Sequence, residues 1–144
     1  MFKLTDSYPF LLNRVGVRLG DLFARRIASY GVTVPMYRVM TALREAGNQR
    51  LNDLAGMTSI EISTLSRLVG SMEKLELLSR SRMENNARSV EIKLTSRGET
   101  MIEELMPMAK HFEDVAIAHL SQEKRDMLKE ILIDIYERLE VIEP

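Results

Sequence analysis

Apolar side chains recur along most of the chain at the three- and four-residue spacing of amphipathic helices. The pattern predicts a first helix from Tyr8 to Tyr30, closed by Gly31, and a second helix that begins near Pro35 and ends at Gly47. The apolar stripe of the first helix consists of Leu11, Leu12, Val15, Leu19, Leu22, Phe23 and Ile27. These two helices are expected to support the segment that follows.

Residues 51–75 have the pattern of two short helices joined by a tight turn. Leu51, Leu54 and Ala55 share one face of the first, and a polar turn follows around Thr58. The second helix begins either with a Thr58–Glu61 capping box or with Glu61 itself as the cap. Its buried stripe is expected to be Ile62, Leu65, Leu68, Val69, Met72 and Leu75. The opposite face carries Ser63, Thr64, Ser66, Arg67, Ser71 and Lys74.

A β-hairpin is predicted next. Val90, Ile92 and Leu94 alternate with polar residues, as in a half-buried strand, and 78–83 supplies the partner strand. Asn85 and Asn86 lie at the expected tip, which Arg80, Arg82 and Arg88 surround. A helix pair followed by such a wing is typical of a DNA-reading unit, and an arm with Arg suits the narrow minor groove. A solvated helix face and a merely solubilising hairpin are the ordinary alternatives.

The last third of the chain predicts two further helices. Ser96 and Glu99 have the spacing of a capping box, Pro107 should kink or break the helix that follows, and Ser121 should cap the last helix. The apolar stripe of that last helix is Met127, Leu128, Ile131, Leu132, Ile135, Leu139 and Ile142. A chain this small has little internal surface to cover so wide a stripe. We therefore expect a dimer seam with the first helix, the alternative being an ordinary core helix.

The charge of the chain is unevenly distributed. The net charge of the 144 residues is −1, which is unpromising for a nucleic-acid ligand. Residues 1–49 hold seven Lys and Arg against three Asp and Glu, and residues 50–98 hold eight against six. Residues 99–144 hold five against twelve, a net −7. The acidic charge is thus concentrated away from the expected reading unit, and the local field drives association with DNA.

Other chemistry finds little support in the sequence. The absence of Cys excludes disulfides, a thiolate zinc site and a cysteine-based redox sensor. His111 and His119 are eight residues apart, which does not match a shared metal face on a helix. There is no glycine-rich phosphate loop and no G-x-S-x-G motif, so we expect neither an enzyme nor a cofactor. With no apolar run near ~20 residues and no signal-peptide pattern at the start, we expect a cytoplasmic protein without a membrane partner.

The ordered residues from Leu54 to Gly98 resemble the MarR (multiple-antibiotic-resistance regulator) family of winged helix-turn-helix transcription regulators. The matching residues are Leu54-Ala55, Ser63-Thr64-Leu65-Ser66-Arg67-Leu68-Val69, Met72-Glu73-Lys74-Leu75, Arg80, Arg88 and Leu94-Thr95-Ser96-Arg97-Gly98. The resemblance implies a mainly α fold with a small β-wing in a single domain, 1–144. The winged core would span 31–98, and residues 1–30 and 99–144 would form dimerisation helices.

The chain departs from the family pattern at two positions. Glu76 stands where the family usually has a Gly with positive φ, so mild backbone strain is expected there. Asn86 stands where the family wing usually has Asp, two residues before its Arg. An amide can form hydrogen bonds but no ion pair, so we expect Asn86 to orient Arg88 less firmly than the family's Asp would.

The resemblance also implies a function and its residues. A homodimer would place the polar helix in the major groove of a pseudo-palindromic operator through Ser63, Thr64, Ser66, Arg67, Ser71 and Lys74, and the wing in the minor groove through Arg82, Asn86 and Arg88. The dimer would use Leu11, Leu12, Met127, Leu128, Ile131, Leu132, Ile135 and Leu139. A small aromatic carboxylate or phenolic effector would release the repressor. The aromatic and cationic side chains of the first two helices that could bind it are Tyr8, Arg14, Arg18, Tyr37 and Arg38, the alternative being that the aromatic side chains belong to the core and the Arg side chains are solvated. The alternative is a winged-helix protein-interaction module that does not read DNA.

Overall fold

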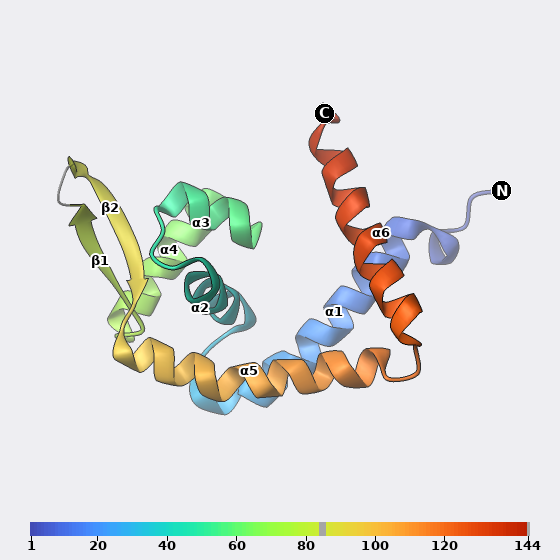
Figure 1. The fold of residues 1–144 in the computed structure, drawn as a ribbon, viewed down its shortest axis with the longest axis horizontal. Coiled ribbons are helices and arrows are strands. Elements are labelled where there is room, and N and C mark those ends of the chain that lie inside the picture. Colours follow the sequence, from blue (N-terminus) through green and yellow to red (C-terminus); the bar gives the residue numbers. More distant parts are fainter. Residues whose placement is uncertain (84–85, 144) are drawn as a thin grey trace. The chain divides into compact units, whose positions relative to one another are not determined.

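The computed structural model describes residues 1–83 and 86–143, with side chains outside 83–89 (Figure 1). The elements in chain order are η1 (Leu4–Asp6), α1 (Tyr8–Ile27), η2 (Ala28–Tyr30), α2 (Val34–Ala46), α3 (Leu51–Thr58), α4 (Ile62–Lys74), β1 (Leu78–Met83), β2 (Asn86–Leu94), α5 (Ser96–Ile117) and α6 (Gln122–Glu140). They form two compact units, Met1–Lys110 and His111–Pro144. The predicted class, mainly helical with a two-stranded wing, is confirmed.

The core of the first unit draws apolar side chains from all its α-helices and from the wing. The largest of its fully buried members are Ile27, Val39, Met40, Leu54, Leu65, Val69, Met72, Leu77, Ile102 and Leu105. No polar or charged side chain of the described residues is buried with them. The hydrophobic effect therefore holds this unit together without buried polar groups that would need partners.

The boundaries of the first two helices follow the sequence signals. Gly31 takes the left-handed conformation at φ +75°, and Gly47 closes α2 at φ +79°. The Thr33 hydroxyl caps α2 by accepting a hydrogen bond from the Met36 amide at 3.3 Å. A left-handed glycine, Val32 and an extended, capping Thr33 thus turn the chain from one helix into the next.

The apolar stripe of α1 is covered over only part of its length. Phe23 and Ile27 are buried, and the Phe23 ring meets Tyr37 of α2 edge-on with 4.7 Å between centroids. Leu11, Leu12, Val15 and Leu22 are exposed. The chain therefore uses the C-terminal end of the stripe for its own core and leaves the N-terminal part open.

The helix-turn-helix consists of α3 and α4. Leu54, Leu65, Val69 and Met72 are completely buried, and Ser59 between the helices takes φ +59°. The predicted α4 stripe is too wide at its ends, because the side chains of Ile62 and Leu75 are exposed. Both residues lie at helix termini, beyond the reach of the surrounding core.

The turn after α4 contains the expected strained residue. Glu76 takes φ +61°, the conformation that favours Gly. The Thr95 hydroxyl donates a hydrogen bond to the Glu76 carbonyl at 2.6 Å. This bond stabilises the strained turn from the far end of the wing, since Thr95 directly follows β2.

The start of α5 differs from the expectation. Thr95, rather than Ser96 with Glu99, caps the helix, because its hydroxyl oxygen accepts from the Gly98 amide at 3.0 Å. A Cβ at Gly98 would lie 2.2 Å from the Leu77 carbonyl oxygen, so the close approach of these two segments requires glycine. The root of the wing and the start of α5 are therefore packed backbone to backbone.

The wing is an antiparallel hairpin with a root of three segments. Leu78 pairs with Leu94 and Arg82 with Val90, and the register then shifts so that Met83 pairs with Asn86. Gln49 extends the root through two backbone bonds to Ile92, at 3.1 and 2.7 Å. This bridge attaches the hairpin to the loop between α2 and α3.

The second unit contains the end of α5 and the whole of α6. The first of these helices runs through Pro107 without a break, and Ser121 caps α6 through the Lys124 amide at 3.2 Å, as predicted. Arg125 donates to the carbonyl oxygens of Leu120 at 3.0 Å and Ala118 at 3.3 Å, which fixes the turn between the helices. No described residue of α6 is buried.

Candidate nucleic-acid interface

The polar face of α4 is open over its whole length. Leu65, Val69 and Met72 anchor the opposite face in the core and fix the rotation of the helix about its axis. All six predicted contact residues are exposed: Ser63, Thr64, Ser66, Arg67, Ser71 and Lys74. This arrangement presents a narrow, mostly small-residue face on a rigid helix, which suits entry into a major groove.

Glu61 caps α4, as one of the two sequence alternatives expected, and its side chain also bonds two residues of this face. Its carboxylate accepts from the Ser63 hydroxyl at 2.5 Å, from the Thr64 hydroxyl at 2.9 Å and from the Ser63 amide at 3.4 Å. Hydrogen bonds from Ser63 and Thr64 hold the pKa of Glu61 below its usual value. The signal was present in the sequence, since an acidic residue directly precedes the helix that begins with Ile-Ser-Thr.

The wing is tied to α4 by an ion pair. Nε of Arg80, on β1, lies 2.6 Å from Oε1 of Glu73, on α4. Both side chains are partly exposed, so the pair contributes modestly to stability but restricts how the wing root sits on the helix. Arg80 therefore lies at the root of the wing, whereas the sequence placed it near the tip.

Of the three predicted contact residues of the wing, only Arg82 has a described side chain. Arg82 is exposed on β1. Asn86 and Arg88 lie in β2 by their backbone, and their side chains are outside the described residues, as are Glu84 and Asn85. The roles of Asn86 and Arg88 stay predictions.

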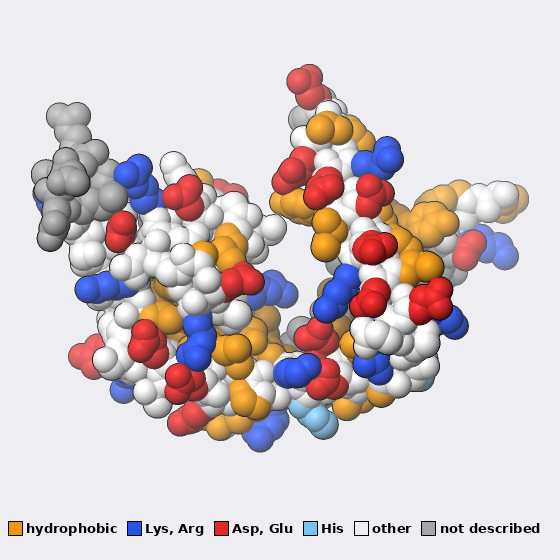
Figure 2. All heavy atoms as spheres, in the orientation of Figure 1, with side chains coloured by type: hydrophobic (Ala, Val, Ile, Leu, Met, Phe, Trp, Pro, Cys, Tyr) orange, Lys and Arg blue, Asp and Glu red, His pale blue; other side chains and the backbone are white. Residues whose placement is uncertain are grey.

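The predicted dimer residues are open in the single chain. Leu11 and Leu12 of α1 are exposed, as are five of the six predicted on α6, and Ile135 is partly exposed. The face of α6 in view in Figure 2 carries hydrophobic side chains among acidic ones. An isolated helix with such a face would leave a large apolar surface in water.

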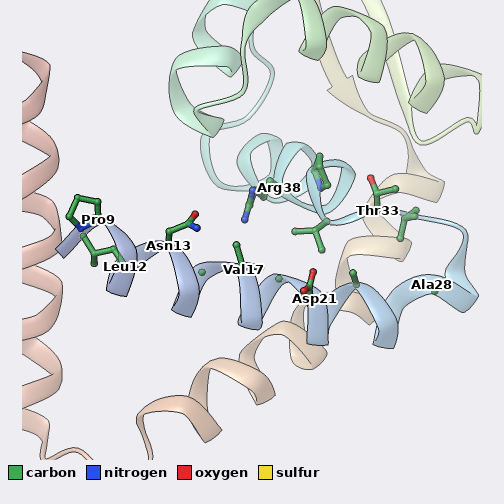
Figure 3. A pocket seen from close by; sticks show the side chains of 14 residues that line it. Pro9, Leu12, Asn13, Val17, Asp21, Ala28, Thr33 and Arg38 are labelled. Carbon is green, nitrogen blue, oxygen red and sulfur yellow. The ribbon is translucent and has the colours of Figure 1, made fainter. Parts of the chain in front are cut away.

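A groove of about 940 Å³ lies between α1 and the start of α2. Figure 3 shows Asn13, Val17 and Asp21 rising from α1 towards the space into which Arg38 points from α2. Gly16 and Gly20 form part of its lining, and a Cβ on either would meet no atom within 4 Å. The missing side chains of these glycines leave room for a ligand.

Only one of the predicted effector residues lines this groove, namely Arg38. Tyr37 packs on Phe23, and the Arg14 guanidinium lies over the Phe10 ring at 5.2 Å. Tyr8 and Arg18 are exposed on α1 outside the lining. The structure therefore does not bring the five predicted residues together around this groove.

The described part of the chain has neither a cluster of metal-ligating side chains nor a helix suited to a membrane. No group of three or more His, Asp or Glu residues is placed there to hold a metal ion. None of its helices combines the length and hydropathy that crossing a membrane requires.

The sequence of the chain is similar to that of known transcription regulators. Residues 32–90 match the sequence model of the MarR family. The transcriptional regulator FarR of Neisseria gonorrhoeae is 31% identical over 104 residues, which cover 72% of this chain and 71% of FarR. The chain belongs to the MarR family. It is therefore a winged helix-turn-helix transcription regulator by family.

Two further proteins are similar to this MarR-family chain over most of its length. The transcriptional repressor YetL of Bacillus subtilis is 24% identical over 131 residues, or 88% of this chain and 77% of YetL. A crystal structure of NadR in complex with 4-hydroxyphenylacetate has a TM-score of 0.81 at 26% identity, covering 94% of this chain and 96% of that one. The match extends over the whole winged helix and both flanking regions.

Proposed function

We propose that this MarR-family chain is a homodimeric repressor that reads a pseudo-palindromic operator and is released by a small aromatic ligand. The observation that carries the proposal is the exposed polar face of α4, from Ser63 to Lys74, on a helix whose other face is buried. A two-fold dimer would offer this face twice, one helical turn of DNA apart. The relative YetL is named a transcriptional repressor, which supports repression rather than activation.

DNA contact would combine α4 with the wing. Arg67 and Lys74 supply donors along the exposed helix face, and Arg82 and Arg88 lie on the two strands of the wing. Cationic side chains at both places suit phosphate oxygens and the narrow minor groove. The ion pair between Glu73 and Arg80 limits the movement between these two contact elements.

Ligand control would use the groove between α1 and α2. Its size suits a small aromatic compound, its lining is mainly apolar, and Arg38 offers a guanidinium to a carboxylate or phenolate. NadR, a relative of similar fold, binds 4-hydroxyphenylacetate, a compound with both groups. A tenfold release of DNA requires about 1.4 kcal/mol of coupling between the two sites.

A direct test measures binding of the purified chain to duplex DNA by fluorescence anisotropy over a range of salt concentrations. We expect binding that weakens steeply with salt and selects one motif. The second candidate, a winged-helix module that docks on proteins, predicts no salt-dependent binding to any duplex. That candidate is favoured only by the small net charge of −1.

The ligand part has its own test. Benzoates, phenols and hydroxycinnamates are screened by thermal shift, and the hits are assayed for release of DNA. A hit that acts in this groove loses its effect in Arg38→Ala and keeps it in Arg25→Ala, an exposed arginine of α1 outside the lining. If every stabilising compound leaves DNA affinity unchanged, the chain is a constitutive regulator.

A further inference from the structure

The first turn of α4 has an unusual hydrogen-bond polarity. Glu61 is the N-cap, and its two carboxylate oxygens each face a hydroxyl, that of Ser63 at 2.5 Å and that of Thr64 at 2.9 Å. All three residues are exposed on the side of the helix proposed to meet DNA. They therefore form one small cluster at the leading end of the recognition helix.

The direction of these hydrogen bonds follows from the chemistry of the groups. A carboxylate only accepts hydrogen bonds. Glutamate is ionised at neutral pH, and the hydrogen bonds from Ser63 and Thr64 lower the pKa of Glu61 further below its usual value. Ser63 and Thr64 must each donate their single hydroxyl proton to it. Towards a ligand, these three side chains can therefore only accept hydrogen bonds, through their remaining oxygen lone pairs.

The remaining side chains of this helix face also differ in whether they offer hydrogen-bond acceptors or donors. The Ser71 hydroxyl donates to the Arg67 carbonyl oxygen at 3.2 Å, so it too offers lone pairs outward. Arg67 and Lys74, in contrast, carry only donors. The face thus begins with an acceptor cluster and has its cationic donors further along the helix.

This polarity decides which groups of DNA the cluster can meet. Phosphate oxygens are anionic acceptors, and they would face both the negative charge and the lone pairs of the cluster. The N-terminus of α4, elsewhere a ready site for phosphate, is already occupied by the Glu61 carboxylate. In the major groove, only the amino groups of cytosine (N4) and adenine (N6) present donors.

We propose that Glu61, Ser63 and Thr64 form an acceptor surface that selects an exocyclic amino group of cytosine or adenine in the major groove and turns phosphate away. Glu61 is the positioning residue, because it orients the two hydroxyls that meet the base. The inference rests on the proposed function, since it requires α4 to enter the groove.

The test is selection from a randomised duplex library followed by sequencing, with three variants. Glu61→Ser removes the carboxylate and keeps a good helix cap, and Thr64→Val keeps the side-chain shape and removes the hydroxyl. Glu45→Ser removes an exposed carboxylate from α2 and is the matched control. Circular dichroism verifies folding, and Thr64→Val, whose cap is intact, decides the test if Glu61→Ser does not fold.

The expected result is one position in each half-site at which the wild type retains cytosine or adenine on one strand. We expect Glu61→Ser and Thr64→Val to weaken this preference about tenfold, and Glu45→Ser to leave it unchanged. The two bases are distinguished by probes, a purine without its N6 amino group or a pyrimidine without its N4 amino group. The relevant probe should weaken wild-type binding and have little effect on Glu61→Ser.

Two outcomes would overturn the inference in different ways. A motif that Glu61→Ser and Thr64→Val share unchanged with the wild type would refute the acceptor surface and leave the proposed function intact. A wild-type chain that retains no motif at all would refute the proposed function, and the inference with it.

Discussion

The helices α4 and α6 both carry an apolar stripe in the sequence, but the fold buries the stripe of α4 and leaves that of α6 exposed. Leu65, Val69 and Met72 of α4 are completely buried, whereas no described residue of α6 is buried. On α6, Ile131 is 48% exposed and Leu139 is 60% exposed. An apolar stripe therefore predicts that one face of a helix will be buried. It does not show whether the same chain or a second chain buries that face.

The polar faces of the two helices differ as well. On α4, small hydroxyl residues accompany Arg67 and Lys74, which a polyanion can approach. The last third of the chain, which contains α6, has a net charge of −7 and would repel DNA. We infer that α4 is the helix offered to DNA and that α6 is offered to a second copy of the chain.

The largest expected difference between the two helices is in a matched pair of leucine truncations, one on each helix. Leu65→Ala should lower the free energy of unfolding by about 2–5 kcal/mol, because it leaves a cavity among fully buried side chains. Leu132→Ala, on an exposed position of α6, should act through the dimer and depend on protein concentration. Urea titration at two protein concentrations measures both effects. Equal losses that are independent of concentration would remove the distinction between the helices.

The second prediction concerns the dimer. Ile131→Asp would place a charge in the proposed seam, and we expect dimer affinity to fall by about 100-fold or more because a carboxylate is costly to desolvate. Ile133→Asp is the matched control, since helical periodicity puts Ile133 on the opposite side from the stripe. Sedimentation follows the dimer, and anisotropy should detect the accompanying loss of operator binding. A dimeric Ile131→Asp would refute the seam and leave the DNA proposal standing.

The third prediction separates binding from folding on α4 and the wing. Arg67→Ala and Arg88→Ala should each weaken operator binding by about 1–3 kcal/mol while the fold is retained. Relaxed preference at one base pair would mark Arg67 as a base contact, and a uniform loss over all sequences would mark a phosphate contact. Arg25→Ala, at an exposed position of α1, is the control. Unchanged affinity in the folded Arg88→Ala variant would exclude the wing from DNA contact.

The smallest expected effect is at the junction of α4 and the wing. A double-mutant cycle of Glu73→Gln and Arg80→Gln should give a coupling of about 0.2–1 kcal/mol in the free energy of unfolding, because the pair is partly exposed. Screening by salt should reduce this value. Operator affinity should fall more than stability if the pair orients the wing. A coupling indistinguishable from zero in both measurements would make the contact incidental.

The helices, their ends and the wing could be predicted because their signals are local. Gly31, Gly47 and Ser121 mark helix ends in the sequence, and each has its predicted role in the structure. The positive φ at Glu76 was also predicted, from a family position that usually holds Gly. Periodicity and turn chemistry need no knowledge of distant residues.

The parts that could not be predicted depend on contacts between elements. The Glu73–Arg80 ion pair joins a helix to a strand, and the Thr95 hydroxyl bridges two turns that are nineteen residues apart. The groove beside Arg38 is lined by residues of α1 and of α2, and no local sequence pattern shows that these residues come together. Residue type along the two helices indicates candidate effector residues without showing which of them share a groove, and of the five only Arg38 lines it.

The most direct test of the central claim is to sequence the genomic fragments that the purified chain retains from the DNA of its source organism. We predict a pseudo-palindromic motif with half-sites about one helical turn apart, as a two-fold pair of α4 helices requires. The same fragments should no longer be enriched by the folded Arg67→Ala variant. Retained fragments without a common motif, or enrichment that Arg67→Ala leaves intact, would contradict the claim that α4 reads DNA.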